Sequence, residues 1–222
     1  MAATPGSELL TLLLADARLP VAGHTQSGGL EAAVRDGLTD VPGFLSGRLA
    51  TVTRVEAGTA VVALHHLRQG LPLEPVEQAW AARTPSRALR TTSRNQARAL
   101  LRLAVRLWPD TAAVRTVTGV GSPPRAVALA AVAVAGGLAP VQLARVTGYD
   151  DVQTVAAAAL KLLPLDPAQV TGWVLDALTD VDRLAAEVAP LTTPDAIPAA
   201  GAPQIEAWAE AHAVSTRRLF SA

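Results

Sequence analysis

Residues 86–107 read SRALRTTSRNQARALLRLAVRL, and this stretch decides the fold class. Six arginines recur every three or four positions, which places them along one side of an α-helix. The opposite side carries mostly Ala and Leu, so the segment is predicted to be a long amphipathic helix with its apolar side in the core. We call the charged side the basic ridge. It consists of Arg87, Arg90, Arg94, Arg98, Arg102 and Arg106, opposite Ala97, Leu100, Leu101, Ala104 and Leu107.

The same helical periodicity extends in both directions along the chain. No run of alternating apolar and polar residues between turn signals indicates a strand. Proline, glycine and capping residues mark the helix ends. The sequence therefore predicts an all-α fold, a single-domain bundle of about ten helices, at 7–18, 27–37, 40–70, 74–84, 86–107, 124–136, a short one around Leu143, 150–163, 166–188 and 204–214.

One domain is expected for this length. Residues 1–203 are predicted to form the body, including a Pro- and Ala-rich loop at 190–203. Residues 204–222 are predicted to be a C-terminal helix and a tail of the same domain. The tail carries Arg217 and Arg218 followed by Leu219 and Phe220. Apolar residues at a chain end make sense when they dock on the protein itself or on a partner.

Composition excludes several classes of function. The formal net charge is zero, so the whole protein has no field that would draw it onto nucleic acid or an anionic membrane. The chain has no cysteine, which removes thiolate chemistry and fits the cytoplasm. The N-terminus lacks the basic region of a signal peptide. The most apolar run, residues 126–137, is shorter than the roughly 20 residues of a membrane span.

Catalytic and metal-binding motifs are equally sparse. No nucleophile elbow or phosphate loop is present, and the chain is not expected to be an enzyme. His65 and His66 are the candidate metal ligands at close spacing. Neighbours on a helix point about 100 degrees apart, so the two cannot chelate one ion within a chain. A stable site normally needs three or four ligands.

The basic ridge is open to three interpretations. It is an ordinary solvated helix face, a surface for an acidic protein partner centred on Arg94 and Arg98, or a contact for phosphate groups. The last would make the protein a helical nucleic-acid-binding or regulatory adaptor using the Arg87 to Arg106 ridge, with steep salt dependence. Stacking aromatic residues are absent from the ridge, which argues against nucleic acid.

A turn directly after the first predicted helix carries the most specific signal. Residues 19–31 read LPVAGHTQSGGLE, and we call them the first motif. The motif resembles the Leu-Pro-x-Gly-x-aromatic-Ser-x-Ser-x-Gly-Leu-Glu turn of the UreF family of urease accessory proteins. Further matches follow in order at 93–100, 136–138, 161–165 and in the Arg-Leu-Phe-Ser end. Departures lie at His24, Gln26, Ala97, Asp166 and Pro167.

The resemblance implies a homodimeric adaptor without enzymatic activity. It would bridge the GTPase UreG to UreD, also called UreH, and help to deliver nickel to the urease apoprotein. Nickel would pass in transit through a channel, with no cofactor held stably. In the family the first motif and the tail become ordered when UreD binds. This role carries over here to Pro20, Gly23, Ser27, Gly29, Leu30 and Glu31, and to Arg217, Arg218, Leu219 and Phe220.

Overall fold

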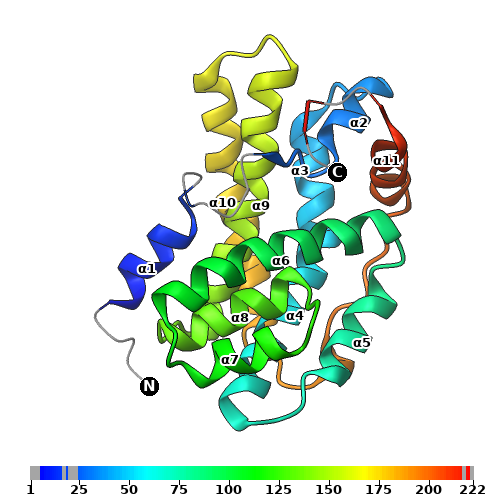
Figure 1. Ribbon diagram of the computed structural model, residues 1–222. Coiled ribbons are helices and arrows are strands. Elements are labelled where there is room, and N and C mark those ends of the chain that lie inside the picture. Colours follow the sequence, from blue (N-terminus) through cyan, green and yellow to red (C-terminus); the bar gives the residue numbers. More distant parts are fainter. Residues whose placement is uncertain (1–5, 17–18, 20–24, 217–218, 221–222) are drawn as a thin grey trace.

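The computed structural model describes residues 6–16, 19, 25–216 and 219–220, and these residues form a helical bundle without a strand (Figure 1). The prediction of an all-α fold is therefore confirmed. The helices are α1 (Ser7–Leu14), α2 (Leu30–Arg35), α3 (Val41–Ala50), α4 (Val52–Gln69), α5 (Glu74–Arg83), α6 (Arg87–Leu107), α7 (Ala112–Gly119), α8 (Arg125–Ala135), α9 (Pro140–Leu162), α10 (Pro167–Val188) and α11 (Pro203–Val214).

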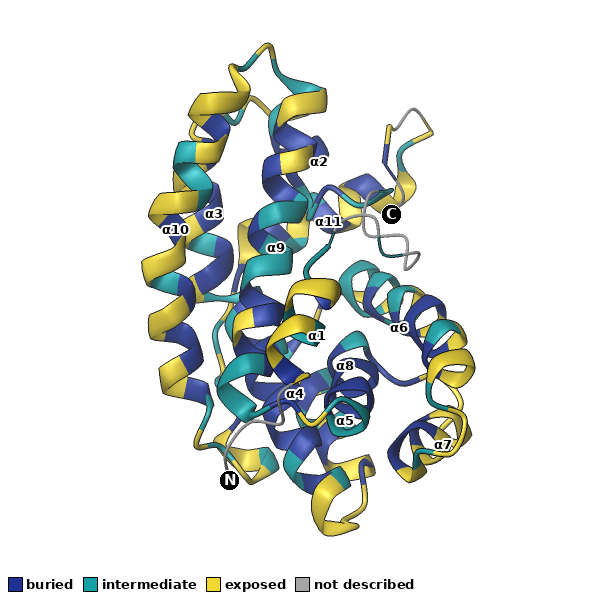
Figure 2. Ribbon diagram, turned by 90° about the vertical axis from the view of Figure 1, so that its left-hand side faces the viewer, coloured by how far each residue is buried: buried dark blue, intermediate teal, exposed yellow. Residues whose placement is uncertain are grey.

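Helices α4 and α8 form the centre of the bundle, and Figure 2 shows most of their residues as buried. One apolar cluster joins α4 and α8 to α5, α6 and α7. A second cluster joins α2, α3, α10 and α11, and α4 and α9 contribute to both. The long antiparallel pair α9 and α10 projects beyond the rest of the bundle (Figure 1). Close helix contacts are possible because Ala and Val supply much of the core.

Side-chain caps fix several helix starts where the sequence predicts them. The Asp40 carboxylate accepts a hydrogen bond from the Gly43 N–H at 2.9 Å and begins α3. The Ser86 hydroxyl accepts one from the Leu89 N–H at 3.2 Å and begins α6. Asp166 does the same for α10 through the Ala168 N–H at 2.9 Å. Each cap satisfies a backbone donor that a helix leaves open at its first turn.

Several helices differ from the sequence-based prediction. Helix α1 ends at Leu14 and α2 spans Leu30–Arg35, where 7–18 and 27–37 were expected. The segment expected as one helix over 40–70 is two, because the backbone of Thr51, with φ −125° and ψ −93°, is not helical and separates α3 from α4. The two helices expected around Leu143 and over 150–163 are one, α9. Gly148 lies inside α9 because a side chain there would crowd Val181 of α10, not because the helix breaks. Helix α7 was not predicted.

The Pro- and Ala-rich loop at 190–203 is packed against the bundle. Ile197 is buried, and a Cβ on Gly58 of α4 would lie 2.6 Å from the ring of Pro198. The Arg83 Nε donates to the Ile197 carbonyl at 2.8 Å. The loop therefore holds α11 in place. Among the described residues, no helix is long and apolar enough to cross a membrane.

Candidate docking site and polar cavity

The side chain of Glu31, at the start of α2, holds the C-terminal tail. Its Oε1 accepts a hydrogen bond from the Leu219 N–H at 2.7 Å, and its Oε2 accepts one from the Phe220 N–H at 3.0 Å. The His212 Nε2 of α11 lies 2.9 Å from Oε2, and the Arg35 Nη2 lies 2.6 Å from Oε1. The first motif and the tail, two predicted partner-binding elements, thus meet at one carboxylate.

The junction between Glu31 and the tail is largely buried. Glu31 is only 1% exposed, and Phe220 is 4% exposed within the second apolar cluster. The ammonium group of Lys161 lies 5.2 Å from the centre of the Phe220 ring. Leu219, by contrast, is 64% exposed. The docked tail therefore buries one apolar side chain and presents the other on the surface.

The protonation of Glu31 follows from its partners. Burial acts to raise the pKa of this carboxyl, but the tail N–H groups, His212 and Arg35 outweigh burial and lower the pKa below its ordinary value. Glu31 is therefore an anion near neutral pH. A buried carboxylate needs this full set of donors, because each unmet hydrogen bond to a buried charge is costly.

Two glycines shape the first motif where it enters α2. Gly28 and Gly29 have φ values of +60° and +88°, a backbone conformation that other residues rarely adopt. The Gly28 carbonyl accepts a hydrogen bond from the Arg48 Nη1 at 2.6 Å. Leu30 is fully buried and Ser27 nearly so. This turn places Glu31 under the tail and fixes the motif to α3.

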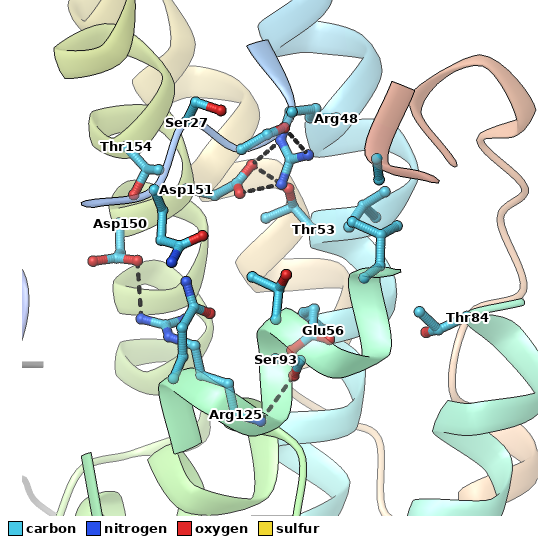
Figure 3. Close-up of a pocket in the computed structure, with 18 of the residues that line it drawn as sticks. Ser27, Arg48, Thr53, Glu56, Thr84, Ser93, Arg125, Asp150, Asp151 and Thr154 are labelled. Atoms are coloured by element: carbon cyan, nitrogen blue, oxygen red, sulfur yellow. Dashed lines mark hydrogen bonds and ion pairs between the residues drawn. The ribbon is translucent and has the colours of Figure 1, made fainter. Parts of the chain in front are cut away.

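A polar cavity of about 120 Å³ lies directly beside this junction (Figure 3). Ser27, Gly29 and His212 line it, so the docking site and the cavity share a wall. Its other walls come from α3, α4, α6, α8 and α9, and the space is large enough for several water molecules. Its charged lining residues are Arg48, Glu56, Arg125, Asp150 and Asp151.

Arg48 and Asp151 form a two-pronged ion pair at one end of the cavity (Figure 3). The Arg48 Nε and Nη2 lie 3.0 and 2.5 Å from the two Asp151 oxygens. The Thr53 hydroxyl donates to the same carboxylate at 2.7 Å. Burial acts to raise the pKa of Asp151, but Arg48 and Thr53 more than compensate and lower it. This end of the cavity is charged and fully bonded.

The other acidic groups are less well compensated. Burial raises the pKa of Asp150, although the Arg125 Nη2 lies 2.9 Å from its Oδ2. Burial also raises the pKa of Glu56, which accepts a hydrogen bond from the Trp80 indole N–H at 2.7 Å. The cavity lining thus holds three carboxyl groups and two guanidinium groups, and two of the three carboxyl groups have raised pKa values.

The basic ridge lies elsewhere, and only part of it is free. The Arg94 Nε donates to the Ser122 carbonyl at 3.2 Å, and its guanidinium lies 5.3 Å from the Trp80 ring centre. Arg90 bonds the carbonyls of Thr84 and Pro85 at 2.7 Å each. Arg98 is exposed and bonds Asn95 within its own helix. Leu107, expected on the buried side, is 50% exposed because α6 ends there.

The two adjacent histidines do not converge. His66 is buried, and its Nδ1 lies 2.7 Å from the Pro72 carbonyl, so this side chain helps to close the end of α4. The His65 ring is half-buried, and its centre lies 6.3 Å from that of His66. In the described part of the chain, no three His, Cys, Asp or Glu side chains lie close enough to hold a metal ion together.

Four predicted residues, Pro20, Gly23, Arg217 and Arg218, lie outside the described residues. The charged residues of the cavity, Arg48, Glu56, Arg125, Asp150 and Asp151, were not predicted from the sequence. A usable signal was present, since Arg48 and Glu56 stand among apolar residues on predicted helices, where a charge needs a buried partner. Their partners are 103 and 24 positions away, so spacing alone could not pair them.

Comparison with known proteins gives one consistent answer. A family profile described as UreF matches residues 37–178. The urease accessory protein UreF of Mycolicibacterium vanbaalenii is 41% identical over 192 residues, covering 82% of this chain and 86% of the relative. Those of Mycobacterium sp. (strain JLS) and Mycobacterium marinum are 36% and 34% identical, and each alignment covers 96% of this chain and 98% or 97% of the relative.

Proposed function

The chain belongs to the UreF family of urease accessory proteins, and we propose that it acts as a non-enzymatic adaptor in the cytoplasm, joining UreG to UreD during urease maturation. In this role it works as a homodimer, and nickel is the cargo that the assembly passes to the urease apoprotein. The docked tail carries the proposal, because it brings the first motif and Leu219 to one surface.

The tail supports binding of UreD at this surface. Glu31 fixes the backbone of Leu219 and Phe220, and Phe220 anchors the tail in the core. The exposed Leu219 then offers an apolar contact that is already ordered, so little conformational entropy is lost there when a partner binds. Exposed apolar side chains beside polar residues are typical of protein interfaces. In the proposed complex, UreD covers Leu219 and the rim of the first motif.

The polar cavity supports passage of nickel rather than storage. Its lining holds three carboxyl groups, of which Arg48 and Arg125 pair with two, and the carboxyl group of Glu56 has no cationic partner among the described residues. A transport path must attract an ion enough to admit it and bind it weakly enough to release it. We propose that hydrated nickel crosses this region on its way to UreD and urease, through a channel completed in the assembly.

Coupling to GTP hydrolysis requires that the adaptor distinguish the nucleotide states of UreG. A ligand shifts an equilibrium only by its difference in affinity for the two states. We therefore expect this protein to bind GTP-loaded and GDP-loaded UreG with different affinities. Equal affinities in a calorimetric titration would remove the coupling from the proposal.

The decisive experiment is co-expression with UreD and UreG, followed by size-exclusion chromatography with light scattering. Four forms are compared: the full chain, a form ending at Thr216, Leu219→Ala and Phe220→Ala. We expect the full chain to form a defined complex with two copies of each subunit, and the truncated form to lose UreD. Leu219→Ala should weaken UreD binding without releasing the tail, whereas Phe220→Ala should do both.

Retention of UreD by the truncated form would show that the tail is not its binding site. A full chain that binds neither protein would overturn the adaptor role. The exposed Val214 provides a matched control, because Val214→Ala trims an exposed apolar side chain at the end of α11, close in sequence to the tail. This variant should assemble as the full chain does.

A further inference from the structure

A second hollow lies on another side of α6 from the polar cavity. It is a groove of about 830 Å³ between the α4–α5 connection, α5, α6 and α7. On α6, Ser93 lines the cavity and the next residue, Arg94, lines the groove, and the two spaces share no residue. The groove is therefore separate from the site proposed for UreD and nickel. We call it the α5 groove.

One atom in this groove lacks a partner. The Oε1 of Glu77 is shielded from solvent and has no hydrogen bond, and among the described residues it is the one buried side-chain nitrogen or oxygen in that state. Burial raises the pKa of Glu77, with Arg94 acting in the opposite direction and Glu74 in the same one. Buried polar groups in folded proteins are nearly always bonded, so an unpaired carboxylate oxygen indicates a donor that arrives from outside.

Arg94, the cationic residue that lines the groove with Glu77, already has other interaction partners. Arg94 donates to the Ser122 carbonyl and stacks over Trp80, and it forms no ion pair with Glu77. Glu74 at the rim adds a second carboxylate, which accepts only from the Gln78 amide at 3.0 Å. Two carboxylates thus share the groove with one guanidinium that is held elsewhere. The groove has room and charge for one more cation.

The walls indicate what kind of cation fits. Leu71 and Val120, on either side of the groove, are 44% and 39% exposed. A bare metal ion would leave these side chains uncovered, and two carboxylates are too few for a stable metal site. A basic side chain flanked by apolar residues would both pair with the carboxylates and cover Leu71 and Val120. Arginine suits best, because its planar fork can donate to two acceptors at once.

We propose that the α5 groove is a docking site for a partner protein that inserts an arginine beside an apolar residue. The side chain of Glu77 turns toward the groove so that its carboxylate meets the guanidinium, with Glu74 at the rim, while the apolar neighbour covers Leu71 and Val120. The argument uses only charge and shape in this groove, so it does not depend on the tail or on the proposed nickel path.

The test uses the full chain labelled with ¹⁵N and two short peptides, acetyl-Leu-Arg-Leu-amide and its citrulline analogue, followed by NMR. Citrulline keeps the shape of arginine and removes its charge. The arginine peptide should shift amide signals at 70–81 and 116–120, and the citrulline peptide should bind at least about tenfold more weakly. Glu77→Gln should cause the same loss, while Glu74→Gln should change affinity by no more than about twofold.

Several results would overturn the proposal. Shifts confined to other regions, equal binding of the two peptides, or full binding by Glu77→Gln would each do so. Loss of the dimer in Glu77→Gln, measured by light scattering, would assign the groove to a second copy of this chain instead. Folding does not confuse the outcome, because replacing an unpaired carboxylate by an amide of equal size leaves the apolar contacts intact.

Discussion

Glu31 and Phe220 are 189 positions apart, yet the carboxylate of the first accepts a hydrogen bond from the backbone N–H of the second at 3.0 Å. Together with the hydrogen bond from the Leu219 N–H, this bond fixes residues 219–220 against the surface of the bundle. The backbone N–H groups of Leu219 and Phe220 find their acceptor, Glu31, within the same chain. Glu31 is thereby the residue on which the geometry of the docking site depends.

Replacing Glu31 by alanine should release the tail and destabilise the fold. The change leaves two tail N–H groups and His212 without their acceptor in a buried place. Loss of one member of a buried charged network costs about 3 kcal/mol or more. Hydrogen exchange should show that Leu219 and Phe220 lose protection, and chemical denaturation should show the lower stability. Glu8→Ala, on an exposed position of α1, is the control; unchanged protection of the tail in Glu31→Ala would contradict the assignment.

Phe220→Ala should undock the tail with a smaller effect on the bundle. Burying a Phe side chain contributes about 2 to 3 kcal/mol, and a chain end can leave its pocket without opening the core. The melting temperature should therefore fall by only a few degrees, while a protease should cut the tail much faster. Leu219→Ala should leave both quantities nearly unchanged, since that side chain is mostly exposed. Equal cleavage of the two variants would show that Phe220 is not the anchor.

The Arg48–Asp151 pair offers a test of the cavity wall. Asp151→Asn should lower the free energy of unfolding by about 3 to 5 kcal/mol, because Arg48 then stays buried without its counter-charge. Arg48→Met combined with Asp151→Leu should recover much of this loss, because no unpaired charge remains. Denaturant midpoints of Arg48→Met, Asp151→Leu and the double variant measure the coupling. A double variant whose loss equals the sum of the two single losses would mean that the pair does not act as a unit.

Glu56 should make stability depend on pH in a defined direction. Its pKa is raised in the folded protein, so between its ordinary value and the raised one the native state holds a proton that the unfolded state has lost. Stability should therefore fall as pH rises through that window. Glu56→Gln should flatten this fall and be more stable than the natural protein at neutral pH. Thermal melts across the mildly acidic range measure it; an unchanged slope in Glu56→Gln would assign the dependence to Asp150 or another group.

Glu31 and Asp151 act in the opposite direction. Their pKa values are lowered in the folded protein, so their stabilising effect is present above their ordinary values and is lost as pH falls through the folded ones. Variants that weaken either network should therefore be less stable at neutral pH and should lose less stability on acidification, because the stabilisation that acid removes is already gone. Arg48→Met is the most direct case, because it removes the main group that lowers the pKa of Asp151. A fall in stability on acidification as large as in the natural protein would argue against this cause.

The helices themselves are largely local in origin. The periodic arginines of residues 86–107, the caps at Asp40, Ser86 and Asp166, and the prolines and glycines at helix ends are sufficient to predict most of them. Errors arose where local signals mislead. The backbone of Thr51 leaves the helical conformation and separates α3 from α4, and Gly148 stays inside α9 because α10 packs against it. The packing at Gly148 depends on a contact between residues far apart in the sequence.

The sequence by itself determined the all-helical class, the family and the two elements proposed to bind a partner. Only the tertiary structure decided that these elements meet at Glu31, that Arg48 closes one end of a polar cavity with Asp151, and that Glu77 is left without a partner. The physical reason is distance along the chain. Helix periodicity is set by neighbours within about four residues, whereas a buried charge finds its partner wherever folding brings one within hydrogen-bond reach.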